Sequence, residues 1–212
     1  SLGINPTYSL ERFREAHDLI IRAWTEPGPF RFEGKHYETR YLNPWPVPIQ
    51  KPHPPIWIPG FGSRETVEWC AHPSRRYSYL AVFMPDHLVK WFFDLYREYA
   101  AGFGYEASPY QMGHLLPVYV GETDEKAEAE AADWVLWLYH YGLRHKFEQF
   151  FPPGYVSLDA MQRIIDHKDE LDFGSMDFKT LNDNGYCVVG SANTVRERLA
   201  NYVDDLGFGL VL

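Results

Sequence analysis

A glycine-bracketed turn followed by two hydroxyl side chains is the part of this sequence best suited to bind an anion. Gly60 and Gly62 flank Phe61, and the next hydroxyls belong to Ser63 and Thr66. Glycines permit a sharp backbone turn, and a Ser N-cap leaves the first backbone N–H groups of a helix pointing outward. With the helix dipole, these groups predict a phosphate site at Gly62, Ser63 and Thr66. The alternative is that Ser63 only caps its own helix, which is the commoner role of such a sequence.

A second helix start of similar design lies near the carboxyl end of the chain. Gly190 and Ser191 are followed by Ala192, Asn193 and Thr194, ahead of an amphipathic run. Ordinary capping by Ser191 or Asn193 again explains the pattern without a ligand. In α/β folds the loops after the strands form the ligand face, so we expect both helix starts to open on the same side of one sheet. Gly190 and Ser191 therefore join the predicted binding residues.

The histidines do not form a metal-binding pattern. His53, His114, His140 and His145 lack the His-x-x-x-His spacing and a flanking carboxylate, so no metal site is predicted. His53 precedes two prolines, and we expect it to bond a loop carbonyl. His140 and His145 fall near the end of a predicted helix, where they either face a cavity or lie in solvent.

Other catalytic signatures are missing from the sequence. No Gly-x-Ser-x-Gly elbow, P-loop or zinc motif is present, which disfavours hydrolase and kinase functions. Cys70 and Cys187 lie in apolar runs without Cys-x-x-Cys spacing, and we expect buried free thiols in a reducing compartment. The aromatic fraction of 17% suits either a core or a pocket for a flat ring or a sugar.

Amphipathic helices and short apolar strands must position these residues. We expect helices over residues 9–24, from Ser63, over 86–101, from Thr123 or Asp124, over 158–167 and over 194–206, with Gly207 as a C-cap. The helix from Thr123 or Asp124 is expected to bury Ala127, Ala131, Trp134, Val135 and Leu138. We expect a hairpin around residues 30–39, an extended proline-rich stretch over 43–55, and strands at 56–58, 77–83, 115–120, 186–189 and 210–212.

The alternation of strands and helices indicates an α/β protein, either a (β/α)-barrel or a doubly wound sheet. We expect a single domain over residues 1–212, with an aromatic-rich insertion at about 147–184. A barrel needs eight strand–helix units, and a half barrel leaves strand edges exposed. We therefore expect either a fragment of a longer protein or a homo-oligomer whose partner chains cover the edges.

The bulk composition excludes several classes of function. With Lys+Arg 20 against Asp+Glu 29, the net charge is −9, so no basic field attracts nucleic acid or anionic lipid. No apolar run is long enough to predict a membrane span, and no secretion signal is evident. The cytoplasm is the expected location.

Several segments in order resemble the bacterial luciferase-like flavin monooxygenase family. They are residues 12–15, 20–25, 32–37 and 46–57, and they match in both order and spacing. Residues 62–71 are similar to the family's strand-5 turn, where a Ser and a Thr three apart hold the flavin phosphate. The run from Gly190 resembles a late helix start of the family, although Ala192 and Asn193 depart from its usual Pro-Glu.

The resemblance implies a (β/α)8 TIM-barrel fold of which this chain holds the C-terminal half, strands 5 to 8. Strands 1 to 4 would be absent, and with them the family's catalytic positions, so the catalytic residues are unknown. The implied activity is that of an FMN-dependent monooxygenase: oxygen insertion into a small organic substrate, using reduced FMN supplied by a flavin reductase. The insertion at 147–184 would be a lid over the pocket.

Three functional alternatives stay open. A deazaflavin could replace FMN, although the Ser63 and Thr66 turn resembles the FMN-using branches. The chain could instead be a non-catalytic flavin-binding or interaction protein. Its aromatic content alone also allows a carbohydrate-active barrel, which would need two facing carboxylates.

Overall fold

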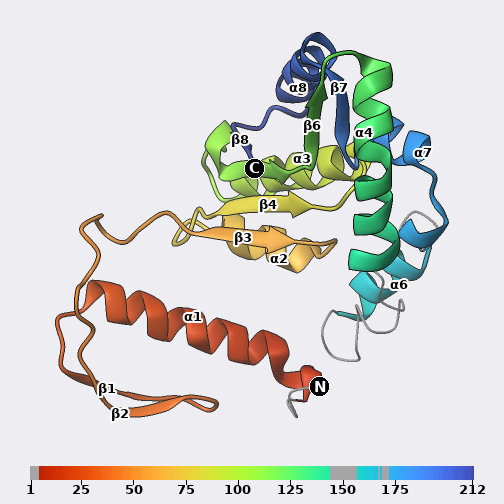
Figure 1. Cartoon of the computed structure of the whole chain (residues 1–212). Coiled ribbons are helices and arrows are strands. Elements are labelled where there is room, and N and C mark those ends of the chain that lie inside the picture. The colour runs from red at the N-terminus through yellow and green to blue at the C-terminus, as the bar shows by residue number, and fades with distance from the viewer. Residues whose placement is uncertain (1–4, 144–156, 167, 169–171) are drawn as a thin grey trace. The chain divides into compact units, whose positions relative to one another are not determined.

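The computed structural model describes residues 5–143, 157–166, 168 and 172–212 (Figure 1). The chain forms two compact units, one comprising residues 1–55 and 147–161, the other 56–146 and 162–212. The sequence-based boundary of one domain over 1–212 stays a prediction, and so does the insertion at 147–184, much of which lies outside the described residues.

The first unit contains a helix and a hairpin, as the sequence predicts. A short 3-10 turn η1 (Pro6–Tyr8) leads into α1 (Ser9–Thr25), followed by the antiparallel strands β1 (Phe30–Glu33) and β2 (Glu38–Leu42). The carboxylate of Glu15 in α1 accepts the main-chain N–H groups of Lys35, His36 and Tyr37 at 2.7–3.0 Å. One side chain therefore fastens the hairpin turn to the helix. The proline-rich residues 43–55 contain no helix or strand.

A four-stranded parallel sheet forms the centre of the second unit. Its strand order is β3 (Trp57–Gly60), β4 (Ser78–Val82), β5 (Met112–Leu115) and β8 (Leu210–Val211). Helix α2 (Arg64–Ala71) connects β3 to β4, and α3 (Asp86–Gly102), with the 3-10 turn η2 (Pro109–Gln111), connects β4 to β5. Because parallel strands need such crossovers, the turns after β3 and β4 meet at one edge of the sheet.

The main core lies between this sheet and its helices. It is lined by Ile58, Tyr79, Ala81 and Met112 of the strands, and by Val67, Cys70, Phe92, Phe93 and Tyr96 of α2 and α3. The ring of Tyr79 packs against Phe92 of α3, with centroids 6.0 Å apart. Tyr79 therefore points toward the helix layer. His114 of β5 is also buried, with Phe208 edge-on to its ring.

A second, smaller layer is built on two further parallel strands. β6 (Val118–Gly121) pairs with β7 (Val188–Ser191), and α4 (Asp124–Trp137) and α8 (Ala192–Leu206) lie on either side of the pair (Figure 1). The prediction of one strand over 115–120 is therefore wrong. Pro117 carries no N–H and interrupts the ladder between β5 and β6, so the chain leaves one sheet and enters another.

The remaining helices were predicted only in part. A π-helical turn η3 (Leu138–Gly142) follows α4, then α6 (Leu158–Asp166), the 3-10 turn η5 (Phe173–Ser175) and α7 (Phe178–Asp183). The sequence predicts α6 but misses α7, which Asp177 caps by accepting the N–H of Thr180 at 2.7 Å. The Thr123 cap of α4 and the left-handed Gly207 after α8 are confirmed.

The predicted buried face of α4 is wrong at one position. Ala127, Ala131 and Val135 are buried, but Trp134 is 75% exposed. Helical spacing predicts a core position for the large Trp134 ring, but the small side chains of Ala127 and Ala131 face β6 and β7 and let α4 lie close to them. Among the described helices, none is long and apolar enough to cross a membrane.

Replacing Gly60 by Ala is expected to destabilise the second unit. An added Cβ would lie 2.6 Å from Cζ of the buried Tyr79 ring, and such overpacking costs about 1–3 kcal/mol. Urea unfolding measures the loss. Gly102→Ala is the matched control, because its added Cβ meets no atom within 4 Å among the described residues. Equal stability of the two variants would contradict this packing.

The stability of the chain is expected to fall between pH 6.5 and pH 4 because of His114. Burial lowers its pKa from 6.5 to about 4, so the folded state favours the neutral ring. The contribution of the neutral His114 ring to the free energy of unfolding is complete above its pKa in the unfolded state. It is lost as the pH falls toward its pKa in the folded state, by about 3 kcal/mol at pH 4. Urea unfolding across this range should show a shallower slope for His114→Leu, but not for His72→Leu, whose ring is partly exposed.

Candidate functional site

The turn after β3 has the geometry of a helix start with an outward-facing N-terminus. Ser63 is the N-cap of α2, in extended backbone conformation, and its Oγ accepts the N–H of Thr66 at 3.3 Å. The predicted helix start is therefore confirmed. A cap satisfies only some of the backbone N–H groups in the first turn of a helix. The remaining N–H groups and the helix dipole favour a negative charge at this end.

The floor of this turn is the buried ring of Tyr79. Gly60 lies so close to it that a side chain would overlap the ring. Gly62 has φ 101, a conformation that favours glycine, and a Cβ added there would meet no atom within 4 Å among the described residues. The turn therefore packs against the Tyr79 ring on one side, at Gly60, and is open on the other, at Gly62. A phosphate group has room to approach the backbone.

One acidic side chain already lies at this helix start. The hydroxyl of Ser63 donates to Oε2 of Glu65 at 2.8 Å. A carboxylate in the first turn of a helix is favourable in its own right.

The second predicted helix start is occupied by a carboxylate of the same chain. Ser191 is the N-cap of α8, and its Oγ accepts the N–H of Thr194. Oδ1 of Asp124 accepts the N–H of Ser191 at 2.5 Å, and Oδ2 accepts the Thr194 hydroxyl at 3.0 Å. Asp124 therefore takes the place that a phosphate would take. The Ser191 N–H is the main cause that lowers the pKa of Asp124, followed by the Thr194 hydroxyl.

The two helix starts also belong to different sheets. Ser63 follows β3 in the four-stranded sheet, whereas Ser191 ends β7 in the two-stranded sheet. The expectation that both open on one side of one sheet is wrong, because the break at Pro117 divides the strands between two layers. The assignment of Gly190 and Ser191 as binding residues stays a prediction that this geometry does not favour.

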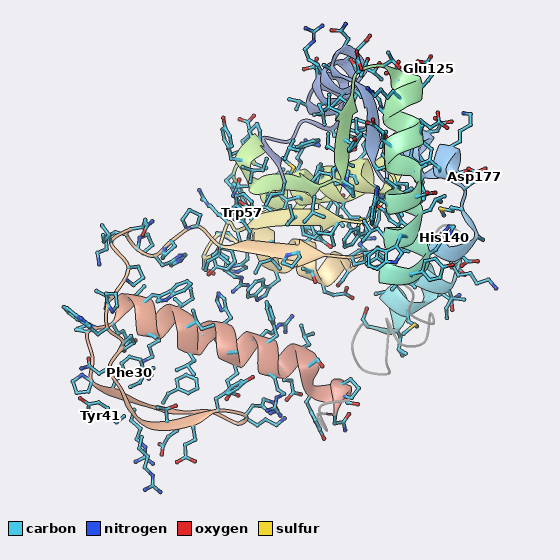
Figure 2. The ribbon with its side chains drawn as sticks, in the orientation of Figure 1. Phe30, Tyr41, Trp57, Glu125, His140 and Asp177 are labelled. Atoms are coloured by element: carbon cyan, nitrogen blue, oxygen red, sulfur yellow. The ribbon has the colours of Figure 1, made fainter. Side chains whose placement is uncertain are left out.

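His53 and His140 contact main-chain carbonyls, and both cysteines are buried. His53 Nδ1 lies 2.8 Å from the carbonyl of Pro54, the loop contact predicted for it. His140 lies in η3 (Figure 2), and its Nε2 is 2.8 Å from the carbonyl of Met176, which joins η3 to the segment before α7. His145 lies outside the described residues. Cys70 and Cys187 are buried and free, and burial raises the pKa of both thiols to about 12.

Within the described residues, no group of three or more His, Cys, Asp or Glu side chains is placed to hold a metal ion. The helical spacing of Trp91, Phe92 and Trp134 predicts core positions for all three rings. Phe92 is buried, but Trp91 and Trp134 are exposed.

A buried carboxyl near the β4 end of the sheet was not singled out from the sequence. Asp86 begins α3, and its Oδ1 packs against Gly185, which has φ 81. Burial raises the pKa of Asp86, whereas the hydroxyl of Tyr202 and the charge of Arg198 lower it. Arg198 in turn donates to Oδ1 of Asn182 at 2.7 Å. This polar cluster ties α3 to the β7 layer, and only the Pro85-Asp86 helix start signals it in the sequence.

Asp124→Ala is expected to lower the melting temperature and to open an anion site at α8. The variant loses the carboxylate that accepts the Ser191 N–H and the Thr194 hydroxyl. Inorganic phosphate should then raise the melting temperature of the variant more than that of the unchanged chain. Glu125→Ala is the control, because Glu125 lies in the same first turn of α4 (Figure 2), whereas the contacts with Ser191 and Thr194 are those of Asp124. The same phosphate response in all three proteins would contradict this arrangement.

Comparisons with known proteins extend over nearly the whole chain. The protein y4wF of Sinorhizobium fredii is 26% identical over 215 residues, which cover 99% of this chain and 55% of that protein. The family model described as luciferase-like monooxygenase matches residues 1–208.

Two solved structures share the fold. The first is the oxygenating constituent of 3,6-diketocamphane monooxygenase from Pseudomonas putida in complex with FMN. It has a TM-score of 0.69 and 18% identity, and the alignment covers 99% of this chain and 58% of that one. The second is the coenzyme F420 dependent tetrahydromethanopterin reductase from Methanopyrus kandleri, with a TM-score of 0.61, 14% identity and coverage of 98% and 57%.

The chain spans somewhat more than half the length of each of these proteins. Its α/β architecture, with helices returning between parallel strands, is the luciferase-like fold of these neighbours. By the match over residues 1–208, the chain belongs to the luciferase-like monooxygenase family.

Proposed function

We propose that this chain belongs to a flavin-dependent monooxygenase that uses reduced FMN and oxygen on a small organic substrate, and that its β3–α2 turn holds the FMN phosphate. The observation that carries the proposal is the open turn at Gly62, which leads into the Ser63 cap and the first-turn N–H groups of α2. These groups suit a phosphate. The FMN complex of the 3,6-diketocamphane monooxygenase constituent supports the choice of cofactor.

The proposed fold is the second half of a (β/α)8 barrel. The parallel strand order β3, β4, β5, β8 supports an assignment to consecutive barrel strands 5 to 8. The sheet has unpaired edges at β3 and β8 among the described residues. Four further strand–helix units would cover both, in keeping with the share of the neighbours' length that the chain matches.

The chain's own residues would bind and orient the cofactor. When bound, reduced FMN supplies the reducing electrons for oxygen insertion. Ser63 and Thr66 would donate their hydroxyls to the phosphate, and the backbone N–H groups after Gly62 would point at it. Tyr79 would keep the turn in shape from below.

FMN is proposed rather than a deazaflavin because of the two hydroxyls at this turn, although one structural neighbour depends on coenzyme F420. The proposal includes a flavin reductase as the source of reduced FMN, a cytoplasmic location and a homo-oligomeric state. The net charge of −9 supports a small-molecule substrate rather than nucleic acid, because a negative protein repels the phosphate backbone.

Ser63→Ala combined with Thr66→Val should weaken FMN binding about 10- to 100-fold. Each lost charge-assisted hydrogen bond contributes roughly 1.5–3 kcal/mol, partly replaced by water in the variant. Titration of FMN by flavin fluorescence measures the affinity. Ser191→Ala is the matched control at the other helix start and should bind FMN like the unchanged chain. Greater loss in Ser191→Ala than in the double variant would move the phosphate site to α8.

Oxygen consumption separates an enzyme from a binding protein of the same fold. The proposal predicts that the full-length enzyme, which supplies the other half of the barrel, consumes oxygen faster than free reduced FMN does when a substrate is present. FMN binding without any such turnover would favour a non-catalytic flavin-binding protein instead.

A further inference from the structure

The hydroxyl of Tyr79, beneath the β3–α2 turn, is buried without a hydrogen-bond partner among the described residues. Tyr79 belongs to β4, and its ring is fully buried. A phenol hydroxyl can both donate and accept hydrogen bonds. An unsatisfied polar group in the interior destabilises a protein by more than a typical hydrogen bond stabilises it. A phenylalanine would fill the same space without this cost, so the hydroxyl needs another explanation.

The hydroxyl lies under the two glycines of the turn. A Cβ added at Gly60 would lie 2.6 Å from Oη. The pKa of Tyr79 is raised by burial first and by Cys70 second, and it is lowered by the main-chain N–H of Gly62. An N–H group has this effect only where it faces the oxygen. Oη is therefore directed at the backbone from Gly60 to Gly62, although the contact with the Gly62 N–H falls short of a hydrogen bond.

Glycine backbone lies between this hydroxyl and the start of α2. A Cβ added at Gly62 would meet no atom within 4 Å among the described residues, and its φ of 101 is one that glycine adopts readily. The side chain between the two glycines is that of Phe61, which packs on Phe173 at 6.2 Å. Small changes in the dihedral angles of the glycines can bring Oη within reach of a group bound at the Ser63 cap.

Other buried tyrosines of the same unit have main-chain acceptors for their hydroxyls. Tyr96 donates to the carbonyl of Tyr77 at 2.9 Å, and Tyr139 donates to the carbonyl of Tyr186 at 2.6 Å. Tyr79 departs from this pattern at the one place where it underlies a helix start. The acceptor for its proton therefore has to come from a bound ligand.

The charges of the turn do not supply this acceptor. The first turn of α2 carries one charge of each sign, Arg64 and Glu65. The Arg64 guanidinium lies over the ring of Trp91 at 5.7 Å, and the Glu65 carboxylate accepts the Ser63 hydroxyl at 2.8 Å. Neither charge is among the groups that shift the pKa of Tyr79. Phosphate oxygens, in contrast, can accept from the N–H groups of α2 and from a hydroxyl at the same time.

We propose that Tyr79 is a further phosphate-binding residue: when a phosphate group binds at the start of α2, the turn from Gly60 to Gly62 shifts and the Tyr79 hydroxyl donates a hydrogen bond to a phosphate oxygen. This inference rests on the proposed function, because it uses the same phosphate position at the Ser63 cap. The ligand-free chain keeps an unsatisfied hydroxyl, and phosphate binding satisfies it.

Tyr79→Phe in the full chain tests the role of the hydroxyl. The variant loses only an unsatisfied group, so the melting temperature of the ligand-free chain should rise by about 2–4 °C. Its affinity for FMN should fall about tenfold, because one charge-assisted hydrogen bond to the phosphate is lost. Its affinity for riboflavin, which has no phosphate, should stay the same. Flavin fluorescence titrations measure both affinities.

Tyr96→Phe is the matched control, because it removes the same atom from a buried tyrosine of the same core. Its hydroxyl has a partner to lose, the carbonyl of Tyr77. The melting temperature of this variant should therefore fall, and both flavin affinities should stay the same. Phosphorus NMR of bound FMN should show a changed signal in Tyr79→Phe but not in Tyr96→Phe.

The outcomes separate this inference from the proposed cofactor. A preference for FMN over riboflavin that is equally large in Tyr79→Phe would overturn the role of Tyr79 and leave the proposed cofactor standing. A fall in the melting temperature of ligand-free Tyr79→Phe as large as that of Tyr96→Phe would also overturn it, because the hydroxyl would then already have a partner.

Equal binding of FMN and riboflavin by the unchanged chain would overturn the proposed cofactor, and inorganic phosphate would then decide about Tyr79. A rise in melting temperature with phosphate that is present in the unchanged chain and lost in Tyr79→Phe would support the hydroxyl as a phosphate ligand. The same rise in both proteins, or no rise in either, would overturn it.

Discussion

The ring of Tyr79 lies directly beneath the backbone of Gly60, and the shape of the β3–α2 turn depends on this contact. Parallel pairing of β3 with β4 places Tyr79 opposite Ile58, two residues before Gly60 on the neighbouring strand. Because Gly60 has no side chain, the backbone can approach the Tyr79 ring closely. Gly62, with φ 101, then turns the chain into α2. Ser63 is thereby presented as an N-cap above a buried, rigid floor. The helix start and the ring of Phe61 both depend on this contact for their positions.

Two helix starts with nearly the same local sequence have different surroundings. At Ser63 the hydroxyl donates to Glu65 of the same helix turn, and a Cβ added at Gly62 meets no atom within 4 Å among the described residues. At Ser191 the carboxylate of Asp124, 67 residues earlier in the chain, accepts the N–H and the neighbouring Thr194 hydroxyl. The same donors that suit a phosphate suit a carboxylate of the protein itself. A capping motif therefore becomes a ligand site only where tertiary structure leaves its donors accessible.

This contrast explains which features were predictable from the sequence. Local signals were sufficient for the caps at Ser63, Thr123 and Gly207, because the residues that form a cap are neighbours in the chain. The alternation of strands and helices likewise predicted the α/β class.

Long-range features were not predictable from one sequence. The apolar run around Pro117 predicts one strand, because the exchange between sheets depends on partners 70 residues away. The exposure of Trp134 was not predictable, because the helical period does not show which face of a helix packs against the rest of the protein. The contact of Asp124 with Ser191 and the strained φ of Phe83 have no local signature at all. The sequence therefore predicted both helix starts but could not show that a carboxylate distant in the chain, that of Asp124, occupies the one at Ser191.

A comparison of FMN with riboflavin tests the central claim most directly, because the two flavins differ only in the phosphate. If the β3–α2 turn holds that phosphate, the chain should bind FMN at least about tenfold tighter than riboflavin, a difference of about 1.4 kcal/mol. Ser63→Ala with Thr66→Val should remove most of this preference by weakening FMN alone. Equal affinity for the two flavins, or a preference for FMN that survives the double substitution, would contradict the account.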